Sequence, residues 1–343
     1  MTILAGGVGS RFWPVSTPDR PKQLLPLGSD RPLIVDTVER ARALTPDERL
    51  RLLTGSHLVD PFERSLPEVP ESSYFVEPRA RGTGPVLAWS AWRIRREDPD
   101  AVLVSLHADH VIQPLERFVT TVRQAVDVAR RHDLLVTLAA RPDRPEIGYG
   151  YIQPGEALET AGAERAFRVS AFHEKPDAET ARRYVDGGYL WNTGIFVWKA
   201  ARFLEEVRIH EPRIGAAMDR LEHGDVAGFF EQVPGTSVDE AVLERSRRVA
   251  AVEAGFRWDD VGSWEALART READGRGNVT LGEARVVDGS NNIVFGEDGP
   301  VVLFGVDDLV AVRTGAVTLV TRRALAPRLK ELLDRLPDEV RDA

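Results

Sequence analysis

Cysteine is absent from this 343-residue chain, which excludes disulfides, thiolate metal sites and cysteine nucleophiles. The sequence also lacks an apolar run long enough to span a membrane. Its first residues do not show the basic segment and apolar core of a secretory signal peptide. These absences predict a cytoplasmic protein without a membrane partner.

Positive charge is in deficit, since 45 lysines and arginines stand against 54 aspartates and glutamates and give a net charge of −9 at pH 7. The chain has no basic tract of the kind that nucleic-acid binding requires, so no nucleic-acid partner is expected. With 43% hydrophobic residues, the sequence fits a globular protein with one large and one small domain, or with two domains.

The most informative segment is at the beginning, where the apolar run Ile3–Ala5 leads directly into GGVGSR at residues 6–11. Glycines let the backbone approach a ligand closely and adopt positive φ, and successive amides can point at phosphate oxygens. Basic side chains follow, with Arg11 ending this run and Lys22 standing in PKQ at 21–23. The combination predicts a loop that binds a triphosphate.

Two common phosphate-binding loops do not fit this segment. The dinucleotide fingerprint G-x-G-x-x-G opens a helix, but Phe12 occupies the third glycine position and Pro14 disfavours a helix start. The P-loop requires Gly-Lys-Ser/Thr after its glycines, and the chain has no such run here. A glycine-rich turn with solvated charges is the remaining alternative, and the linked Arg11, Pro14 and Lys22 count against it.

Strand patterns alternate with helical patterns over the first two-thirds of the chain. Strands are expected near 3–5, 50–53, 74–76, 101–106, 134–138, 167–172, 194–198 and 248–252, and helices near 33–44, 84–96, 118–129, 177–186, 200–222 and 238–246. The alternation predicts an α/β fold with a doubly wound, mostly parallel, Rossmann-like sheet. Ligands of such sheets bind beyond the carboxyl ends of the strands, where the glycine loop and Asp109 are expected.

The pattern changes after about residue 274. Short β-rich runs near 284–287, 292–295, 301–304, 309–312 and 317–320 are separated by turns, and an amphipathic helix over 326–336 follows. We therefore expect a large domain over residues 1–274 and a small β-rich domain over 275–343 that ends in a helix. The runs lack a clean hexapeptide repeat, so a regular β-helix stays open, and this unit could serve as a homodimer interface.

Acidic candidates for cation binding begin with Asp109, in HADH at 107–110 after the predicted strand 101–106. A carboxylate there is well placed for a hard cation, which prefers oxygen ligands. His107 and Asp109 alternate onto one face, as a zinc-like site would require. The sequence shows no third nitrogen or sulfur ligand near these residues, and Mg²⁺ rarely takes imidazole. The histidines are therefore expected to be packing or loop residues.

Several motifs together resemble the sugar-1-phosphate nucleotidyltransferase family. GGxGxRxxP at 6–14 with PKQ at 21–23 resembles the family signature, and FWPVS at 12–16 is most similar to its mannose-1-phosphate guanylyltransferase branch. Further matches follow in the family's order: ADH at 108–110, GYGY at 148–151, EKP at 174–176, WNTG at 191–194 and DVGSW at 260–264. The resemblance covers residues 3–264 and continues more weakly through the β-rich unit.

The resemblance implies that residues 1–274 form a nucleotidyltransferase catalytic domain. Its expected reaction is transfer of GMP from GTP to α-D-mannose 1-phosphate, which gives GDP-mannose and pyrophosphate with Mg²⁺ as cofactor. A same-fold enzyme for another hexose 1-phosphate or nucleoside triphosphate stays open, as does a non-catalytic subunit that binds a nucleotide sugar. A nicotinamide-dependent dehydrogenase is disfavoured by the missing third glycine.

The resemblance also implies roles for individual residues. The catalytic residues would be Arg11, Lys22, Asp109 and Asp260, with Asp109 and Asp260 as the metal ligands. The nucleotide-binding residues would be Leu4, Ala5, Gly6, Gly7, Gly9, Ser10, Arg11, Lys22, Glu77, Arg81, Thr83 and Asp109. The residues for the sugar phosphate would be Gly148, Glu174, Lys175, Asn192, Gly194 and Asp260.

Two parts of this assignment depart from the simple pattern. The family commonly shows Asn-Thr-Ala where this chain has Gly-Thr-Gly at 82–84, so base contacts from the segment 77–83 stay open. Within the paired aspartates, the resemblance gives the metal role to Asp260 rather than Asp259. Tyr149 and Tyr151 are expected to pack rather than to bind a ligand.

Overall fold

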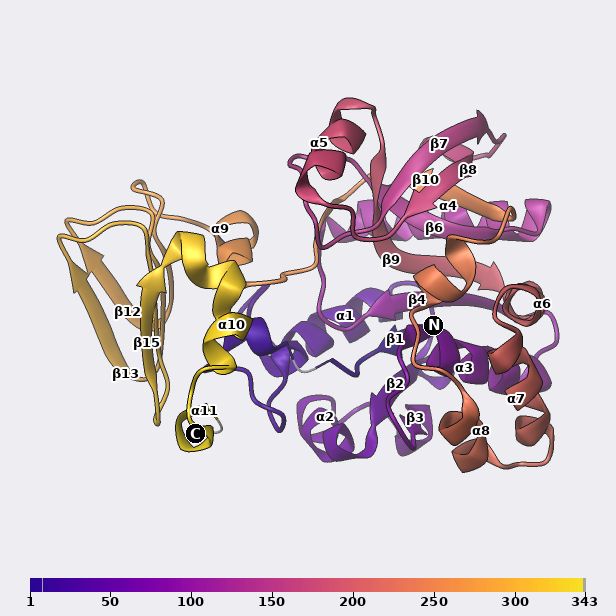
Figure 1. The fold of residues 1–343 in the computed structure, drawn as a ribbon, viewed down its shortest axis with the longest axis horizontal. Helices are drawn as coiled ribbons and strands as arrows, with labels where there is room; N and C mark the ends of the chain where they lie inside the picture. Colours follow the sequence, from indigo (N-terminus) through magenta and orange to yellow (C-terminus); the bar gives the residue numbers. More distant parts are fainter. Residues whose placement is uncertain (8, 342–343) are drawn as a thin grey trace.

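The computed structural model describes residues 1–7 and 9–341. Val8 of the glycine-rich loop and the last two residues of the expected C-terminal domain lie outside the described residues. Figure 1 shows a large body of helices around a sheet, with a β-rich unit beside it. Within the described residues, no helix combines the length and apolarity needed to cross a membrane.

A nine-stranded sheet forms the centre of the body, in the order β3-β2-β1-β4-β9-β6-β10-β8-β7. Its strands are β1 (Thr2–Leu4), β2 (Arg51–Gly55), β3 (Tyr74–Glu77), β4 (Val102–His107), β6 (Leu135–Ala140), β7 (Tyr151–Ala157), β8 (Ala166–His173), β9 (Leu190–Lys199) and β10 (Val249–Glu253). β1 pairs in parallel with β2 and β4, whereas β9 runs antiparallel to β4 and β6. The predicted α/β fold is confirmed, and the sheet is mixed because β9 is antiparallel to its neighbours and β8 is antiparallel to β10 and β7. The sequence did not show this direction because buried apolar runs look alike in either orientation.

Helices cover both faces of the sheet (Figure 1). They are α1 (Leu33–Arg42), α2 (Val59–Ser65), α3 (Thr83–Glu97), α4 (Leu115–His132), α5 (Ala178–Asp186), α6 (Ala200–His210), α7 (Pro212–Glu222) and α8 (Val226–Gln232). Because successive strand side chains point to opposite faces, Ile3 packs in one core with α1 and α4, and Leu4 packs in the other with α3 and α6. The short β1 is therefore fixed from both sides, and its end is a rigid position for the loop that follows.

Two predicted helices differ from the observed ones. The single helix expected over 200–222 is wrong, because α6 ends at His210 and α7 begins at Pro212. Proline suits the first turn of a helix but disfavours helical geometry in the residue before it. The helix expected over 238–246 is instead one turn of π-helix, Asp239–Leu243. Such turns occur frequently at functional sites.

The β-rich unit contains β12 (Val279–Val287), β13 (Ile293–Phe304), β14 (Leu309–Arg313) and β15 (Thr318–Arg322). The runs expected at 292–295 and 301–304 are one strand, β13, which pairs in parallel with β12 and β14. The closing helix expected over 326–336 is broken into a 3-10 segment (Arg323–Arg328), which contains Pro327, then α10 (Leu329–Leu333) and α11 (Asp338–Arg341). Proline limits continuous helix at this point.

A short ribbon that the sequence analysis did not identify connects the two parts. It pairs β5 (Val111–Gln113) with β11 (Arg257–Asp259) in antiparallel orientation, and α9 (Leu267–Thr270) follows. Beside it, a third core joins the loop after β1 to the β-rich unit. In that core the rings of Phe12 and Trp264 lie 5.1 Å apart, and those of Trp264 and Phe295 lie 5.7 Å apart.

We predict that Phe295→Ala lowers the free energy of unfolding by about 3–5 kcal/mol, the usual cost of emptying a buried phenylalanine site. Phe295 is 4% exposed and packs in the third core. Phe304→Ala is the matched control, because Phe304 lies on the same strand but is 72% exposed. Its effect should stay within about 0.5 kcal/mol. Urea unfolding measures both, and equal losses would contradict the assignment of Phe295 to a core that joins the two parts.

Candidate active site

The loop after β1 is shaped around the side chain of Lys22. Gly9 has φ 73°, and a Cβ atom on it would lie 2.3 Å from the Cβ of Lys22. Any other residue would therefore both strain the backbone and collide with Lys22. The hydroxyl of Ser16 donates to the carbonyl of Gly9 at 2.7 Å and holds the turn. Gly9 is thus required by the fold itself, whereas Gly6 and Gly7 are exposed and leave their backbone accessible.

Lys22 brings two of the predicted carboxylate residues together. Its side chain is buried, and its Nζ donates to Asp109 Oδ2 at 2.9 Å and to the main-chain carbonyl of Asp260. Asp109 follows β4 and Asp260 follows β11, so two segments that lie far apart in the sequence both reach Lys22. The structure therefore places three of the four predicted catalytic residues in direct contact.

The charge on Asp109 is set by opposing effects. Burial alone would raise the pKa of this carboxyl, but the ammonium of Lys22 holds the pKa well below its usual value. A carboxylate next to a cation stays ionised because its charged form is stabilised. Asp109 is consequently negative at neutral pH, as a cation ligand must be.

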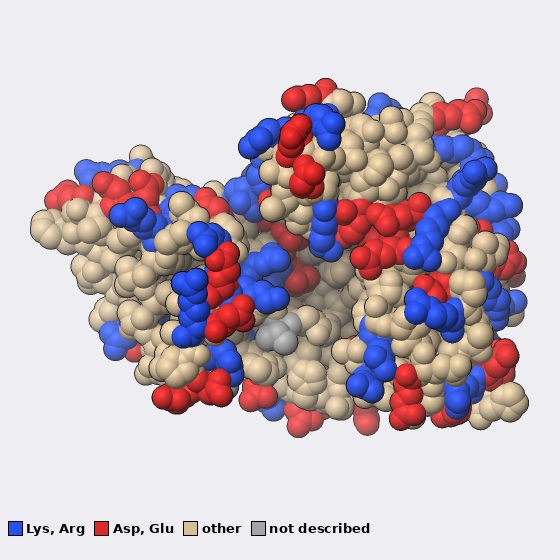
Figure 2. Space-filling view, viewed as in Figure 1, with Lys and Arg blue, Asp and Glu red and all other residues tan. Residues whose placement is uncertain are grey.

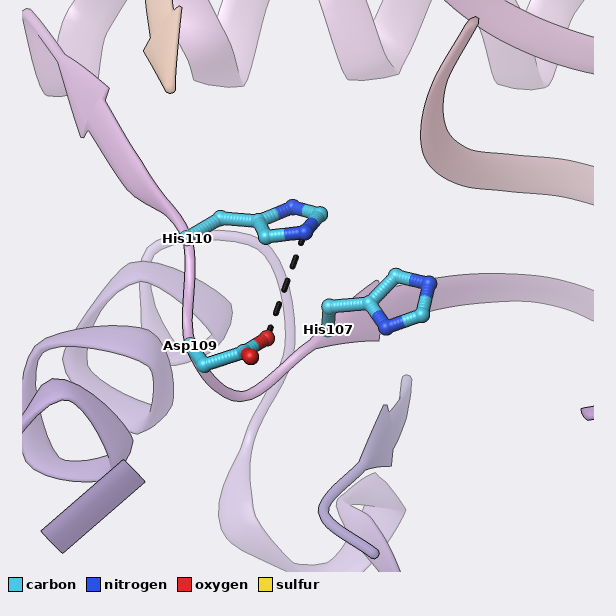
Figure 3. Close-up of side chains that lie close together, drawn as sticks. All are labelled: His107, Asp109 and His110. Carbon is cyan, nitrogen blue, oxygen red and sulfur yellow. Dashed lines mark ion pairs between the residues drawn. The ribbon is translucent and has the colours of Figure 1, made fainter. Parts of the chain in front are cut away.

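His107 and His110 accompany Asp109 and offer ligand atoms within 4.8 Å of one another (Figure 3). Trp258 Nε1 donates to His110 Nδ1 at 3.1 Å. A neutral imidazole that accepts at Nδ1 carries its proton on Nε2, which leaves no free lone pair for a metal. Burial and the neighbouring His107 lower the pKa of His110 well below its usual value, so the ring is neutral. The geometry supports the packing role expected for this histidine.

Asp260 is held by a tyrosine that was expected only to pack. The ring of Tyr149 does pack against Trp191 and Trp258, but its hydroxyl donates to Asp260 Oδ1 at 2.5 Å. The expectation for Tyr149 was therefore wrong for its hydroxyl, because a motif of alternating glycine and tyrosine does not show where the phenol ends. Burial, partly offset by Lys22, raises the pKa of Asp260.

Arg11, the fourth predicted catalytic residue, reaches the loop of Asp260. Its Nη1 donates to the carbonyl of Gly262 at 3.2 Å, and its other guanidinium donors have no hydrogen-bond partner among the described residues. Each carboxylate also keeps one oxygen, Oδ1 of Asp109 and Oδ2 of Asp260, without a hydrogen bond from the part of the chain that the structure describes. The site can therefore accept both an anion and a cation.

Glu174 and Lys175 lie next to each other at the end of β8. Lys175 Nζ donates to Glu174 Oε1 at 2.5 Å, and the backbone N–H of Glu174 donates to Glu244. A Cβ atom on Gly150 would lie 2.7 Å from Glu174 Oε2. Gly148, which was predicted to bind the sugar phosphate, donates its backbone N–H to Glu146 Oε1 at 3.2 Å. These residues form a cluster in which the donors already have protein partners.

Asn192 and Gly194 also lie against other residues of the chain. Asn192 Oδ1 accepts from the hydroxyl of Thr137 at 2.7 Å, and its Nδ2 donates to Asp239 Oδ1 at 2.9 Å. Gly194 has φ 69°, and a Cβ atom there would lie 2.9 Å from the ring of His107. The glycine therefore makes room for a histidine, which the sequence did not show.

Asp239, in the π-helical turn, was missed by the sequence analysis. Burial, then the neighbouring charge of Glu174, raises its pKa to about 7 from the ordinary 3.8. An aspartate at the start of a helical pattern usually serves as an N-cap, so nothing in the sequence distinguished it. The structure adds Asp239 to the group formed by Asn192 and Glu174.

The segment after β3 contributes unequally to the site. Glu77 Oε1 would lie 3.6 Å from a Cβ on Gly6, and its Oε2 is buried without a hydrogen bond from the described residues. Burial raises the pKa of Glu77 to about 7. Arg81, in contrast, donates to the carbonyls of Phe230 and Glu231 at the end of α8. The hydroxyl of Thr83 accepts the N–H of Val238 at 2.9 Å. Arg81 is therefore bound to the end of α8, and Thr83 to the residue before the π-helical turn.

The remaining nucleotide-side residues lie along β1 and the turn after it. Leu4 is buried, the N–H of Ala5 donates to the carbonyl of Leu53 at 2.9 Å, and Ser10 begins a 3-10 turn. Figure 2 shows a hollow on this face between the body and the β-rich unit, with acidic and basic side chains around it. A separate cavity of about 740 Å³ has a lining that includes Asp259 and Arg269 but neither Lys22 nor Asp109.

The model of the nucleotidyl transferase family matches residues 1–276. The chain belongs to the nucleotidyl transferase family. A second model, the MannoseP isomerase/GMP-like beta-helix domain, matches residues 282–336. The resemblance that the motifs indicated is thereby confirmed.

Relatives in this nucleotidyl transferase family match nearly the whole chain. A mannose-1-phosphate guanylyltransferase of Salmonella montevideo is 34% identical over 99% of this chain and 74% of its own length. The alginate biosynthesis protein AlgA of Pseudomonas aeruginosa is 33% identical over 97% of this chain and 71% of its own length. A crystal structure described as mannose-1-phosphate geranyltransferase from Thermus thermophilus matches with a TM-score of 0.90 and 33% identity, over 97% of this chain and 98% of that chain. The chain therefore falls in the mannose-1-phosphate guanylyltransferase branch.

We predict that Asp239→Asn stabilises this nucleotidyl transferase, and more so at pH 8 than at pH 5. The pKa of the Asp239 carboxyl rises from 3.8 to about 7 on folding. Between these two pH values, the free energy of unfolding therefore falls by about 1.4 kcal/mol for each pH unit. Asparagine can still accept the hydrogen bond from Asn192 and carries no charge. Urea unfolding at the two pH values measures the effect, with the exposed Asp219→Asn as control. A stability difference independent of pH would contradict the raised pKa.

Proposed function

We propose that this protein transfers GMP from GTP to α-D-mannose 1-phosphate, giving GDP-mannose and releasing pyrophosphate. Similarity over nearly the full chain to mannose-1-phosphate guanylyltransferases supports the reaction. The observation that carries it is the contact of the buried Lys22 ammonium with both Asp109 and Asp260, beside the exposed amides of Gly6 and Gly7. One cation, two acidic residues and an anion-binding loop are the groups that phosphoryl-group chemistry needs.

Asp109 and Asp260 are the residues that would hold Mg²⁺. The donor set fits, because each carboxylate has one oxygen bound to the protein and one without a hydrogen bond from the described chain. Carboxylate oxygens are also the ligands that this ion prefers. When bound, Mg²⁺ would neutralise phosphate charge and orient the phosphate oxygens.

The reaction needs no general base from the protein. A phosphate oxygen of the sugar phosphate, already ionised at neutral pH, attacks the α-phosphorus of GTP in line, and pyrophosphate leaves as the bond to the β-phosphate oxygen breaks. The amides of Gly6 and Gly7, with Arg11, hold the leaving pyrophosphate. Lys22 neutralises charge near the reacting phosphate. Catalysis is then positioning of two anions and compensation of their repulsion.

The sugar phosphate is bound at the other end of the site. Lys175 stands at the end of β8 with its ammonium on Glu174, and it would exchange part of that contact for the sugar phosphate. Glu174 accepts from ring hydroxyls. Because Asn192 is held by Thr137 and Asp239, its amide is fixed in orientation before the sugar arrives. Such preorganisation reduces the entropy that binding costs.

Guanine selection is assigned to Glu77. Its carboxylate lies against Gly6, with one buried oxygen lacking a partner among the described residues. Guanine presents two adjacent N–H donors, N1–H and the N2 amino group, on one edge, and a carboxylate can accept both. A purine without this pair of donors leaves the buried oxygen unsatisfied, which costs binding free energy.

A pyrophosphate-release panel tests the reaction. Four nucleoside triphosphates (GTP, ATP, UTP and dTTP) are crossed with mannose 1-phosphate and glucose 1-phosphate, and GTP with mannose 1-phosphate should give the highest kcat/KM. Lys22→Ala should lower kcat by about 10²-fold or more, the cost of losing one electrostatic partner of the transition state. The exposed Lys330→Ala should leave kcat unchanged. A higher kcat/KM for another combination of nucleoside triphosphate and sugar phosphate would assign the reaction to those substrates. No pyrophosphate release with any combination would reject the proposal.

A second prediction concerns the base. Glu77→Gln should raise KM for GTP by about tenfold or more, because glutamine offers one acceptor and one donor where guanine needs two acceptors, at a cost of about 1.5–3 kcal/mol. The KM for mannose 1-phosphate should stay the same. Steady-state kinetics with GTP and ATP measures the ratio of kcat/KM for the two nucleotides. A ratio equal to that of the parent would remove Glu77 from base selection.

A further inference from the structure

Val261 has a backbone conformation that is unusual for its residue type. Its φ is +47°, in the left-handed region, and its side chain is fully buried. Branching at Cβ makes this region costly, and such residues persist there only where the surroundings fix them. Val261 directly follows Asp260, so the strained residue lies next to the acidic residue that contacts Lys22.

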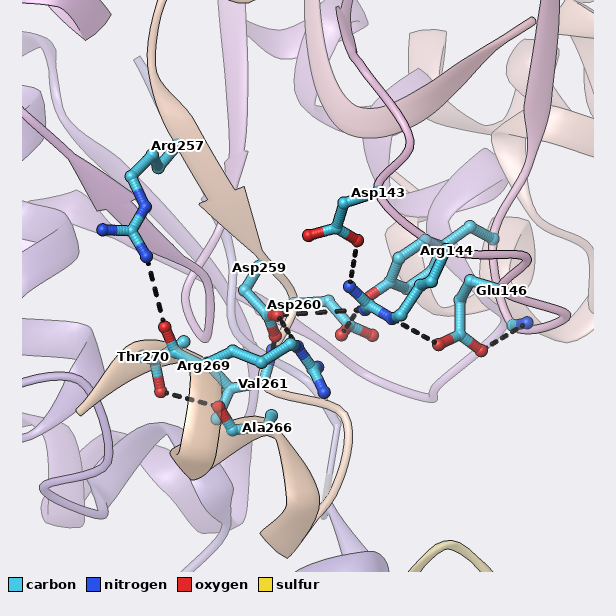
Figure 4. A network of polar contacts seen from close by, with 12 residues as sticks. Asp143, Arg144, Glu146, Arg257, Asp259, Asp260, Val261, Ala266, Arg269 and Thr270 are labelled. Carbon is cyan, nitrogen blue, oxygen red and sulfur yellow. Dashed lines mark hydrogen bonds and ion pairs between the residues drawn. The ribbon is translucent and has the colours of Figure 1, made fainter. Parts of the chain in front are cut away.

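Asp259 closes the turn around this residue. Its Oδ1 accepts the backbone N–H of Val261 at 2.8 Å, and its Oδ2 accepts from Arg269 Nε at 2.7 Å (Figure 4). An aspartate that binds the N–H two residues onward forms an Asx turn, a local device that tolerates left-handed geometry. Arg269 lies in α9, and its charge holds the carboxylate that makes the turn.

The pair differs from an ordinary surface ion pair. Asp259 is 7% exposed, and its contact with Arg269 is a close one between Nε and a carboxylate oxygen. The side chain of Arg269 is partly exposed, at 31%, so its removal leaves the buried Asp259 carboxylate uncompensated, which costs more than loss of an exposed pair. The Asp259–Arg269 contact is therefore a fixed element of the fold.

The turn determines where two groups of Asp260 point. The peptide between Asp260 and Val261 carries the carbonyl that accepts from Lys22, and rotation about φ of Val261 turns that peptide. The Asp260 side chain meanwhile accepts from Tyr149. If Val261 relaxed to negative φ, the carbonyl would leave Lys22, and the carboxylate would lose its direction towards the site.

Arg144 extends this network towards the sugar side. Its Nη2 lies 3.9 Å from Asp259 Oδ2 and donates to the hydroxyl of Tyr149 at 3.3 Å. Its Nε lies 3.4 Å from Glu146, which accepts the N–H of Gly148. Arg144 therefore connects Asp259 with Tyr149, whose hydroxyl donates to Asp260, and Figure 4 shows the polar contacts of Arg144 with Asp143, Glu146 and Asp259.

We propose that Asp259 and Arg269 are a positioning pair, which holds Val261 in its left-handed turn and thereby presents the Asp260 carboxylate to a divalent cation and its carbonyl to Lys22. Asp259 is not itself a cation ligand, because both its oxygens are bound on the other side of the turn. The inference rests on the proposed function only in that Asp260 holds the cation.

The test measures Mn²⁺ binding directly, by electron paramagnetic resonance of free Mn²⁺, with the full chain and without nucleotide. Asp259→Ala and Arg269→Ala should each raise the Kd for Mn²⁺ by about tenfold or more, on the scale of losing a supporting contact of a metal ligand. Arg271→Ala is the matched control, because it lies two residues beyond Arg269 and pairs with Asp30 instead. Its Kd should equal that of the parent.

A rescue variant separates positioning from general damage. Glycine adopts positive φ without strain, so adding Val261→Gly to Asp259→Ala should recover part of the lost Mn²⁺ affinity even though it empties a buried site. Circular dichroism and the Tm establish that each variant is folded. If Asp259→Ala does not fold, Asp259→Asn and Arg269→Lys carry the same comparison.

The outcomes for the pair and for the reaction are distinguishable. Parent-like Mn²⁺ affinity in folded Asp259→Ala or Asp259→Asn overturns the positioning pair, whatever the enzyme activity. A shifted affinity together with no GMP transfer by the parent supports the pair and rejects the proposed reaction. Failure of the parent itself to bind Mn²⁺ rejects the cation role of Asp260 and this inference with it.

Discussion

The ammonium of Lys22 connects the parts of the site. It is buried at 6% exposure and contacts Asp109 and Asp260, which arrive from different strands. A buried charge is tolerated only with such partners, so the Lys22 ammonium depends on the Asp109 carboxylate and the Asp260 carbonyl. The requirement extends to the loop after β1, where Gly9 has no side chain because the Lys22 stem occupies that space. The loop, the lysine and the acidic residues therefore form one unit.

The β-rich unit supports this arrangement by packing. Phe12, next to Arg11, and Trp264, shortly after Asp260, share a core with Phe295 of β13. The two loops that carry the proposed catalytic residues Arg11 and Asp260 are thus fixed against the same third segment. Arg20 strengthens this contact through a bidentate ion pair with Glu297, in which Nη1 donates to Oε2 at 2.7 Å and Nη2 donates to Oε1 at 2.5 Å. The β-rich unit contributes to the site by holding both loops, since its packing sets their separation.

Much of the fold could be predicted, because local patterns report local structure. The alternation of strands and helices, the helix that contains Phe118, and the acidic residues at strand ends all followed from periodicity and residue type. The antiparallel direction of β9 could not be predicted, because a buried apolar strand shows the same residue pattern in either direction. The hydroxyl of Tyr149 was also missed, as were the protein partners of Asn192, because each depends on a residue far along the chain. Asp239 gave no signal beyond that of a helix start.

Residue types and their spacing along the chain predicted a phosphate-binding loop, and the order of the motifs carried the family resemblance that implied the reaction class. Tertiary packing was needed to show which acidic residue of the pair 259–260 faces Lys22, a contact between residues 238 positions apart. Packing also places Val261 in a left-handed turn and directs Asp259 away from the site. The physical reason is that spacing specifies a residue's neighbours along the chain, whereas side-chain direction is set by the packing of segments that the chain brings together.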